Sequence, residues 1–311
     1  MAETIRGVVL RIERSSIYDG DGLRTVLFLK GCPLRCLWCS TPESQRGEPE
    51  RGISREKCAA CGKCVGICPG GALSLSGGRI SFDRSRCTGC FECARICPAG
   101  AVEVYGREMS AEEVVREISK DELFFFHSGG GITISGGEPF AQPRFVRAVL
   151  EGCSRRGIDC AVESSFLAGW EDIEMILPFV SLVHTDIKHP NPAKHKALTG
   201  VENGIILENI LRADRSPHKF GFVIRTPLIP DVNDSDGDIA ALAEFVRKLK
   251  KLRFMEFLAY HRLGTETYKR LDMSYALREI ETPKSEYMER KARLFKELTG
   301  LPVKVNGRDI L

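Results

Sequence analysis

The sequence predicts an α/β protein: a partial (β/α)6-type, TIM-like barrel that is interrupted by a small cysteine-rich insert. Apolar strand-like runs alternate with amphipathic segments through most of the 311 residues, as in β/α units around a parallel sheet. Eleven of the 13 cysteines fall between positions 32 and 97, a density typical of a small unit without a large apolar core. We therefore expect a barrel-sized domain in two parts, residues 1–46 and 109–311, and an insert at 47–108.

The elements of the barrel follow from the hydrophobic pattern. Runs rich in β-branched and aromatic residues predict strands at 25–30, 132–135, 160–162, 182–185, 222–224, 254–259 and 303–305. Amphipathic spacing between them predicts helices near 143–156, 170–180, 204–213, 236–251 and 283–298. Ser110 and Glu113 have the spacing of a capping box, so another helix should begin there.

Composition argues against several functional classes. The net charge is only +3 and both signs are interspersed, so we expect neither a nucleic-acid partner nor a membrane surface. No apolar run reaches the roughly 20 residues that span a bilayer, and the N-terminal residues lack the apolar stretch of a signal peptide. We therefore expect a cytoplasmic protein, in which cysteines bind metals or clusters rather than form disulfides.

The insert contains an internal repeat. Two runs of four cysteines share one spacing, are each followed by proline, and begin 29 residues apart at Cys58 and Cys87. Two-cluster bacterial ferredoxins use this run, and the fourth cysteine of each run binds the other cluster. The repeat predicts two 4Fe–4S clusters in a ferredoxin-like insert, held by Cys58, Cys61, Cys64, Cys97 and by Cys87, Cys90, Cys93, Cys68. Two four-cysteine zinc sites are the alternative.

A separate cysteine triplet, Cys32, Cys36 and Cys39, follows the first predicted strand. Three thiolates leave one coordination position open, and an iron with an open position can bind a molecule that reacts. Trp38, immediately before the third cysteine, offers a flat surface on which a purine ring can stack. The alternatives are a zinc knuckle with a distant fourth ligand or three buried thiols. The spacing resembles the signature of the radical S-adenosylmethionine (radical SAM) superfamily.

Polar residues gather at the carboxyl ends of the predicted strands, where parallel barrels build their active sites. The glycines of the turn at 136–138 would let a ligand approach the backbone, whose carbonyls can accept from an ammonium group. Lys188 or Arg225 could hold the carboxylate of a methionine moiety. The residues at this rim are Cys32, Gly136, Gly137, Glu138, Glu163, Ser164, Ser165, Asp186, Lys188, Arg225 and His261.

Nearly the whole chain resembles one family, the activating enzymes of glycyl radical enzymes. The matching motifs lie at 19–24, 28–45, 128–139, 186–188, 195–200 and 260–264, and the insert is similar to that of the longer members. The resemblance implies a 4Fe–4S cluster on Cys32, Cys36 and Cys39, whose electron cleaves S-adenosylmethionine into methionine and a 5′-deoxyadenosyl radical. It also implies that this radical removes a hydrogen from one glycine α-carbon of a partner glycyl radical enzyme.

The resemblance also carries site residues over to this chain. It implies contacts to S-adenosylmethionine at Trp38, Cys39, Ser40, Gly136, Asp186, Ile187, Lys188, Arg225 and His261, to which the turn residues Gly137 and Glu138 are added. It implies a monovalent cation, Na⁺ or K⁺, beside Glu163, Ser164 and Asp186. Two positions depart from the family pattern: Asp21 replaces the proline of an Asp-Gly-Pro-Gly motif, and Glu163 replaces a common aspartate.

The expected cofactors are S-adenosylmethionine and three 4Fe–4S clusters. The expected partners are a glycyl radical enzyme and a low-potential donor such as flavodoxin or ferredoxin, with the insert clusters relaying electrons inward. We expect a monomer in an anaerobic cytosol, because oxygen destroys a cluster with an exposed iron. Two alternatives stay open: a radical SAM peptide or protein maturase with auxiliary clusters, and a ferredoxin-like electron-transfer protein without catalysis. The sequence does not identify which glycyl radical enzyme is the partner.

Overall fold

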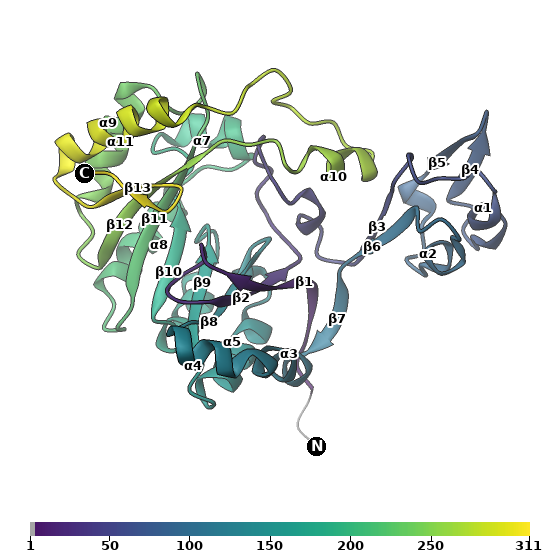
Figure 1. The fold of residues 1–311 in the computed structure, drawn as a ribbon, viewed down its shortest axis with the longest axis horizontal. Coiled ribbons are helices and arrows are strands. Elements are labelled where there is room, and N and C mark those ends of the chain that lie inside the picture. The colour runs from purple at the N-terminus through teal and green to yellow at the C-terminus, as the bar shows by residue number, and fades with distance from the viewer. Residues whose placement is uncertain (1–3) are drawn as a thin grey trace.

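The computed structural model describes residues 4–311, and most of them build around one ten-stranded sheet (Figure 1). In spatial order the strands are β14 (Arg308–Asp309), β13 (Val303–Val305), β12 (Leu252–Ala259), β11 (Gly221–Leu228), β10 (Leu182–Asp186), β9 (Asp159–Ser164), β8 (Gly131–Gly136), β2 (Arg24–Leu29), β1 (Arg6–Ser16) and β7 (Arg107–Ser110). Neighbours from β2 to β13 in this order run parallel, and β1, β7 and β14 pair antiparallel at the ends. The edge strands β7 and β14 do not pair, so the sheet is open.

This mostly parallel sheet confirms the predicted α/β class, and every predicted strand overlaps a strand of the sheet. Parallel strands are buried on both faces, which explains why they read as short continuous apolar runs. In β10, Val183 belongs to the large core beneath the helices. Its neighbour Leu182 packs with Ala161 and Val223 in a smaller cluster.

Helices pack against this sheet and supply the rest of the core. They are α3 (Ala111–Ile118), α4 (Glu122–Ser128), α5 (Pro143–Ser154), α6 (Trp170–Glu174), α7 (Pro192–Thr199), α8 (Gly204–Arg215), α9 (Asp236–Val246), α10 (Thr265–Arg270) and α11 (Ser285–Thr299). The large core contains Ile134, Val149 and Phe295, all fully buried. The predicted capping box is confirmed at α3, where Ser110 Oγ accepts from the Glu113 N–H at 3.1 Å.

The hydrophobic pattern did not indicate α4, α7 or α10. Helices α7 and α10 are short and largely polar, so no apolar stripe marks them. Helix α6 ends at Glu174 rather than near 180, because Pro178 lacks the backbone N–H that an α-helix requires, and a 3₁₀ turn (Leu177–Phe179) follows. None of the helices within residues 4–311 is both long and apolar enough to cross a bilayer.

The cysteine-rich insert projects to one side of the sheet domain (Figure 1). Its stem is the antiparallel pair β3 (Glu50–Ile53) and β6 (Val102–Tyr105), and its body contains α1 (Lys63–Ile67), β4 (Leu73–Ser76), β5 (Arg79–Phe82) and α2 (Glu92–Ile96). A small separate core joins apolar side chains to Cys64 and Cys93. The chain re-enters the main sheet at Arg107, where β7 pairs with β1, so the last residues of the predicted insert lie in that sheet.

Two arginines at equivalent positions of the repeat hold the insert against the end of α10. Arg55 pairs with Asp272, and Arg84, 29 residues later, donates to the carbonyl of Leu271 at 3.1 Å. A third contact has its arginine on α10 instead of on the insert: Arg270 pairs with Glu103 of the stem at 2.8 Å. Helix α10 therefore connects the insert to the loop that follows β12.

Candidate active site

A cavity of about 270 Å³ opens at the carboxyl ends of the parallel strands. The cysteine triplet forms part of its wall, and the carboxyl-terminal parts of β2, β8, β9, β10, β11 and β12 with the segments after them contribute the rest. The structure thus gathers many of the predicted site residues around one cavity: Cys32, Cys36, Trp38, Cys39, Ser40, Gly136, Gly137, Glu163, Ser164, Ser165, Asp186, Lys188 and His261.

The three cysteines of the triplet are partly buried. Burial raises the pKa of Cys32 to about 12 and that of Cys36 to about 11, and it also raises the pKa of Cys39. A thiolate in such a place needs a cation beside it, and iron supplies one. In the part of the chain that the structure describes, no three His, Cys, Asp or Glu side chains converge on a single metal ion. A 4Fe–4S cluster does not need that convergence, because each thiolate binds a different iron, so the triplet fits such a cluster.

Trp38 lies in an aromatic cluster behind the triplet. It is 8% exposed and packs with Tyr260, Tyr268 and Tyr275. The Tyr260 and Tyr275 hydroxyls are 2.8 Å apart, and the rings of Tyr268 and Tyr275 meet edge to face at 5.1 Å. This packing holds the indole of Trp38 as a rigid wall of the cavity.

Packing within the protein requires glycine in the turn after β8, independently of any ligand. Gly136 has φ +114°, and a Cβ there would collide with the backbone of Leu29 on β2. Glu138 does not line the cavity: it is 1% exposed and accepts from Ser164 Oγ at 2.6 Å and from the Ser165 N–H at 2.9 Å. Burial raises the pKa of Glu138 despite these bonds. Its carboxylate therefore ties the turn after β8 to the turn after β9.

Lys188 presents a positive charge to the cavity. Its Nζ lies 2.7 Å from Asp186 Oδ2. Burial alone would lower the pKa of Lys188. The negative charges of Asp186 and Cys36 together have a larger, opposite effect, so the pKa lies above its ordinary value. The ammonium is therefore charged across the physiological range.

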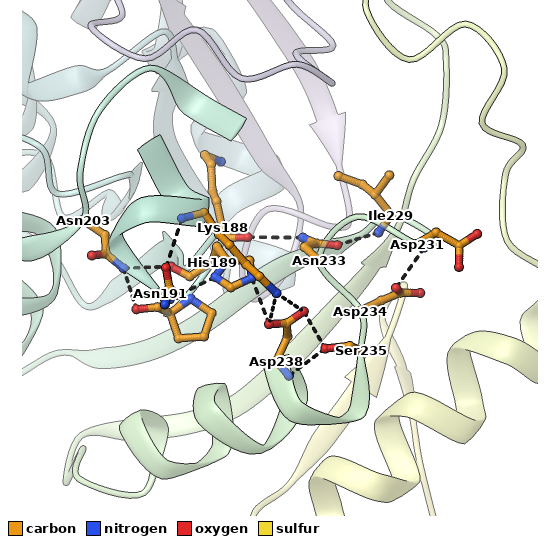
Figure 2. Close-up of polar contacts among 12 residues, drawn as sticks. Lys188, His189, Asn191, Asn203, Ile229, Asp231, Asn233, Asp234, Ser235 and Asp238 are labelled. Carbon is orange, nitrogen blue, oxygen red and sulfur yellow. Dashed lines mark hydrogen bonds and ion pairs between the residues drawn. The ribbon is translucent and has the colours of Figure 1, made fainter. Parts of the chain in front are cut away.

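A buried polar network fixes the loop that carries Lys188 (Figure 2). Asn233 donates to the carbonyl of Lys188 at 3.2 Å and accepts from the N–H of Ile229 at 2.8 Å. Next to it, Asn203 donates to the carbonyl of His189 at 2.8 Å. Asn233 lies in the loop after β11 and Asn203 lies between α7 and α8, so two separate segments fix the backbone from which the Lys188 side chain extends.

Arg225 lies outside the lining of the cavity, although the sequence placed it at the rim. Its Nε donates to Glu256 at 2.9 Å, its Nη1 to Glu163 at 3.0 Å and its Nη2 to the carbonyl of Tyr18 at 2.6 Å. Burial lowers the pKa of Arg225, but these carboxylates raise it above the ordinary value. All three edges of the guanidinium are therefore engaged within the protein. Ile187 also lies outside the cavity, buried in the large core.

The three residues expected around a monovalent cation all line the cavity, but each has another partner. Glu163 accepts from Arg225 and from Ser135 Oγ, the latter at 2.7 Å. Ser164 donates to Glu138, and Asp186 pairs with Lys188. Asp21, where the family motif has proline, forms a surface ion pair with Arg253 at 2.8 Å.

Several lining residues escaped the sequence interpretation. They are Phe28, Leu34, Thr41, Ser44, Ser135, Pro227, Leu258, Ala259 and Tyr260. Phe28, Ser135, Leu258 and Ala259 lie within the last three residues of predicted strands, and Tyr260 directly precedes His261, so counting the last residues of each strand as part of the rim would have found most of them. Their apolar members give the cavity the mixed wall that small-molecule sites usually have.

The insert cysteines separate into groups. One small cavity is lined by Cys58, Cys61, Cys64 and Cys97, and by none of the other insert cysteines. The fourth cysteine of each run accepts a backbone N–H at 3.3 Å, from Ala72 to Cys68 and from Ala101 to Cys97. The donor set and the shared cavity fit the crossed arrangement of a two-cluster ferredoxin.

Comparison with known proteins agrees with this architecture. The model of the radical SAM superfamily matches residues 84–246, and the model of the 4Fe-4S dicluster domain matches residues 57–101. A radical SAM methyltransferase from Sphaerobacter thermophilus shares the fold, with a TM-score of 0.52 at 15% identity over 97% of this chain and 77% of that chain.

The similar curated proteins are activating enzymes. The isethionate sulfite-lyase activating enzyme of Nitratidesulfovibrio vulgaris is 45% identical over 88% of this chain and 90% of its own. The (2S)-3-sulfopropanediol sulfolyase activating enzyme of Bilophila wadsworthia is 41% identical over 91% of this chain and 94% of its own. The trans-4-hydroxy-L-proline dehydratase activating enzyme of Clostridioides difficile is 37% identical over 96% of this chain and 99% of its own. The chain therefore belongs to the radical SAM superfamily and, within it, to the activating enzymes of glycyl radical enzymes.

Proposed function

We propose that Cys32, Cys36 and Cys39 hold the 4Fe–4S cluster of this activating enzyme, and that S-adenosylmethionine binds in the adjoining cavity. One observation carries the proposal: the triplet, Trp38 and Lys188 line a single cavity of about 270 Å³. When bound, the cluster and S-adenosylmethionine supply the reductive cleavage that produces methionine and a 5′-deoxyadenosyl radical. The protein contributes binding, orientation and a shielded path to the partner's glycine.

Lys188 is proposed to bind the carboxylate of the methionine moiety. Its charge is secured by Asp186 at 2.7 Å, and the Asn233 bond to its carbonyl holds its backbone. A charge-assisted hydrogen bond of this kind contributes about 1.5–3 kcal/mol. The backbone at Gly136 and Gly137 would accept from the ammonium end, and Trp38, Ser40, Asp186 and His261 would enclose the rest of the ligand.

Glu138, Ile187 and Arg225 are proposed to act through their neighbours rather than by contact with S-adenosylmethionine. Glu138 joins two rim turns, and Arg225 fixes the side chain of Glu163 at the cavity wall. Arg225 also holds the carbonyl of Tyr18, next to the loop at 19–22 where the family motif lies. Orientation of this loop is the contribution that we propose for Arg225.

We propose that the insert, residues 47–108, holds two further 4Fe–4S clusters and that an acidic flavodoxin or ferredoxin delivers electrons to it. The ligand sets would be Cys58, Cys61, Cys64, Cys97 and Cys87, Cys90, Cys93, Cys68, which brings the total to three clusters. The shared cavity of the first set supports this assignment. Iron and sulfide analysis of the anaerobically reconstituted chain tests it, because replacing either set by alanine should remove one cluster and keep the other two.

We propose a glycyl radical enzyme that acts on a small sulfonate as the partner. Support comes from relatives named for isethionate and sulfopropanediol enzymes, which are 38–45% identical to this chain. The test is anaerobic incubation with S-adenosylmethionine, a strong reductant and one of several glycyl radical enzymes, followed by electron paramagnetic resonance. A glycyl radical signal with a sulfonate lyase, and little with a hydroxyproline dehydratase or choline lyase, supports the proposal. Equal signals across the panel would contradict this partner, and no 5′-deoxyadenosine with any partner would contradict the activity.

We further propose that a monovalent cation binds beside the cavity, that the chain is a monomer, and that it works in an anaerobic cytoplasm. Na⁺ or K⁺ beside Glu163, Ser164 and Asp186 would compete with the pairs to Arg225 and Lys188. Activity in KCl and NaCl, with choline chloride as the control, tests the cation: a salt-independent rate would contradict it. Sedimentation of the reconstituted chain under anaerobic conditions tests the monomer, and iron loss on exposure to air tests the need for an oxygen-free setting.

A further inference from the structure

The two cysteine sets of the insert share a sequence pattern but have different buried surroundings. The cavity of the first set, Cys58, Cys61, Cys64 and Cys97, is lined by apolar side chains that include Ile53, Leu75, Ile80 and Val102. The one ionisable side chain besides cysteine on that lining, Lys63, is exposed, so solvent and salt screen its charge. The second set has a buried arginine beside it.

That arginine is Arg51, on strand β3 at the base of the insert. It is 3% exposed, and its Nη1 donates to the sulfur of Cys93 at 3.4 Å. Its Cζ lies 3.3 Å from the ring centroid of Phe82, which covers one face of the guanidinium. The Nε and Nη2 atoms of Arg51 have no hydrogen-bond partner within residues 4–311. A buried guanidinium with two unpartnered nitrogens is costly, so these edges need an acceptor.

Within residues 4–311, no carboxylate forms an ion pair with Arg51. The adjacent Glu50 is occupied by Lys30 at 3.2 Å and by Arg84 at 2.6 Å. On α2, Glu92 pairs with Arg95 at the surface of the insert. The negative partner that remains for Arg51 is the thiolate group to which Cys93 belongs.

A purely structural role explains only part of this arrangement. Stacking on Phe82 would anchor β3 to β5, because a cation over an aromatic ring is attracted to the negative face of that ring. That role uses the face of the guanidinium and leaves its two free nitrogen edges unexplained. A cluster with four thiolates and four sulfides offers several acceptors on the side where Nη1 already reaches Cys93.

We propose that Arg51 binds against the cluster held by Cys68, Cys87, Cys90 and Cys93, and raises its reduction potential above that of the apolar-walled first cluster. Reduction adds one electron and one negative charge to a cluster, and a buried positive charge nearby favours the reduced form. The two clusters of the insert are then inequivalent, and the second cluster is where an electron resides. This inference rests on the ligand sets proposed above.

The test uses the full-length chain with Cys32, Cys36 and Cys39 changed to alanine, so that only the insert clusters contribute signals. Redox titration monitored by electron paramagnetic resonance measures the two midpoint potentials. Arg51→Met should lower one potential and leave the other in place, and Arg51→Lys, which keeps the charge, should restore much of the loss. Arg95→Met is the matched control, because it removes an exposed, paired arginine two residues from Cys93 and should move neither potential.

A second measurement does not depend on whether the Met variant assembles. With arginine labelled by nitrogen-15 in the guanidinium, pulsed electron paramagnetic resonance should detect a nitrogen coupling to one reduced insert cluster, and Arg51→Lys should abolish it. Potentials in Arg51→Met equal to those of Arg95→Met, or an absent coupling in the unsubstituted chain, would overturn the role of Arg51. A parent chain that assembles fewer than two insert clusters would overturn the ligand sets, and with them this proposal.

Discussion

The position of Arg225 beneath the cavity makes a prediction that separates two roles for this residue. The guanidinium is bonded to Glu256 at 2.9 Å and to Glu163 at 3.0 Å, and its side chain is 7% exposed. In Arg225→Met these two carboxylates lose their shared cation. Removing one partner of a buried ion pair costs about 3–5 kcal/mol, a large share of the roughly 5–15 kcal/mol that stabilises a typical domain.

The same variant should bind S-adenosylmethionine almost normally, because Arg225 does not line the cavity. If Arg225 instead held the carboxylate of the ligand, loss of a charge-assisted bond worth about 1.5–3 kcal/mol would weaken binding by roughly 10- to 150-fold. The assays are thermal unfolding at matched iron content and equilibrium binding of S-adenosylmethionine. The double variant Arg225→Met/Glu256→Gln removes one orphaned charge and should recover part of the stability. Unchanged unfolding together with a tenfold or greater loss of affinity would refute this account of Arg225.

Further predictions follow from the cavity and from the insert. Lys188→Met should weaken binding of S-adenosylmethionine about 10- to 150-fold, whereas Lys194→Met, which removes an exposed lysine of α7, should have no such effect; equal affinities would contradict the carboxylate role. Replacing the first three cysteines of the insert by alanine should slow turnover with flavodoxin but spare 5′-deoxyadenosine formation with a strong chemical reductant, and unchanged turnover with flavodoxin would contradict a relay. The double variant Arg55→Ala/Arg84→Ala should increase hydrogen exchange in α10 at a stability cost of about 1 kcal/mol, and exchange like that of the unsubstituted chain would show that these arginines do not hold the insert.

The sequence predicted the strands well because parallel strands are buried on both faces and keep short apolar runs. It predicted the rim less well, because a polar residue near a predicted strand end can lie either at the edge of the cavity or below it. Arg225 is the clearest example: the predicted strand ended at 224, whereas β11 continues to Leu228. Arg225 pairs in register with Asp186, the last residue of β10, yet its own strand runs three residues further. Its side chain therefore lies below the cavity rather than at its edge.

Cysteine spacing carried more information than any other pattern in this chain. Ligand spacing reflects the geometry of a cluster, so Cys58 and Cys97 could be assigned to one set before the structure showed them on one small cavity. The neighbours that distinguish the two insert sets could not be assigned in this way. Arg51 and Cys93 are 42 residues apart in sequence, and the pairing of β3 with β6 helps to bring them together. No local sequence pattern predicts such a contact.

The central claim is that the triplet and the strand-end cavity together generate a radical that takes hydrogen from a partner's glycine. The most direct measurement uses a partner glycyl radical enzyme labelled with deuterium at the glycine α-carbon, incubated anaerobically with this chain, S-adenosylmethionine and a strong reductant. The account predicts that deuterium appears in 5′-deoxyadenosine, that the glycyl radical signal accumulates, and that Cys36→Ala abolishes both. Abundant 5′-deoxyadenosine without deuterium, or labelled product from Cys36→Ala, would contradict it.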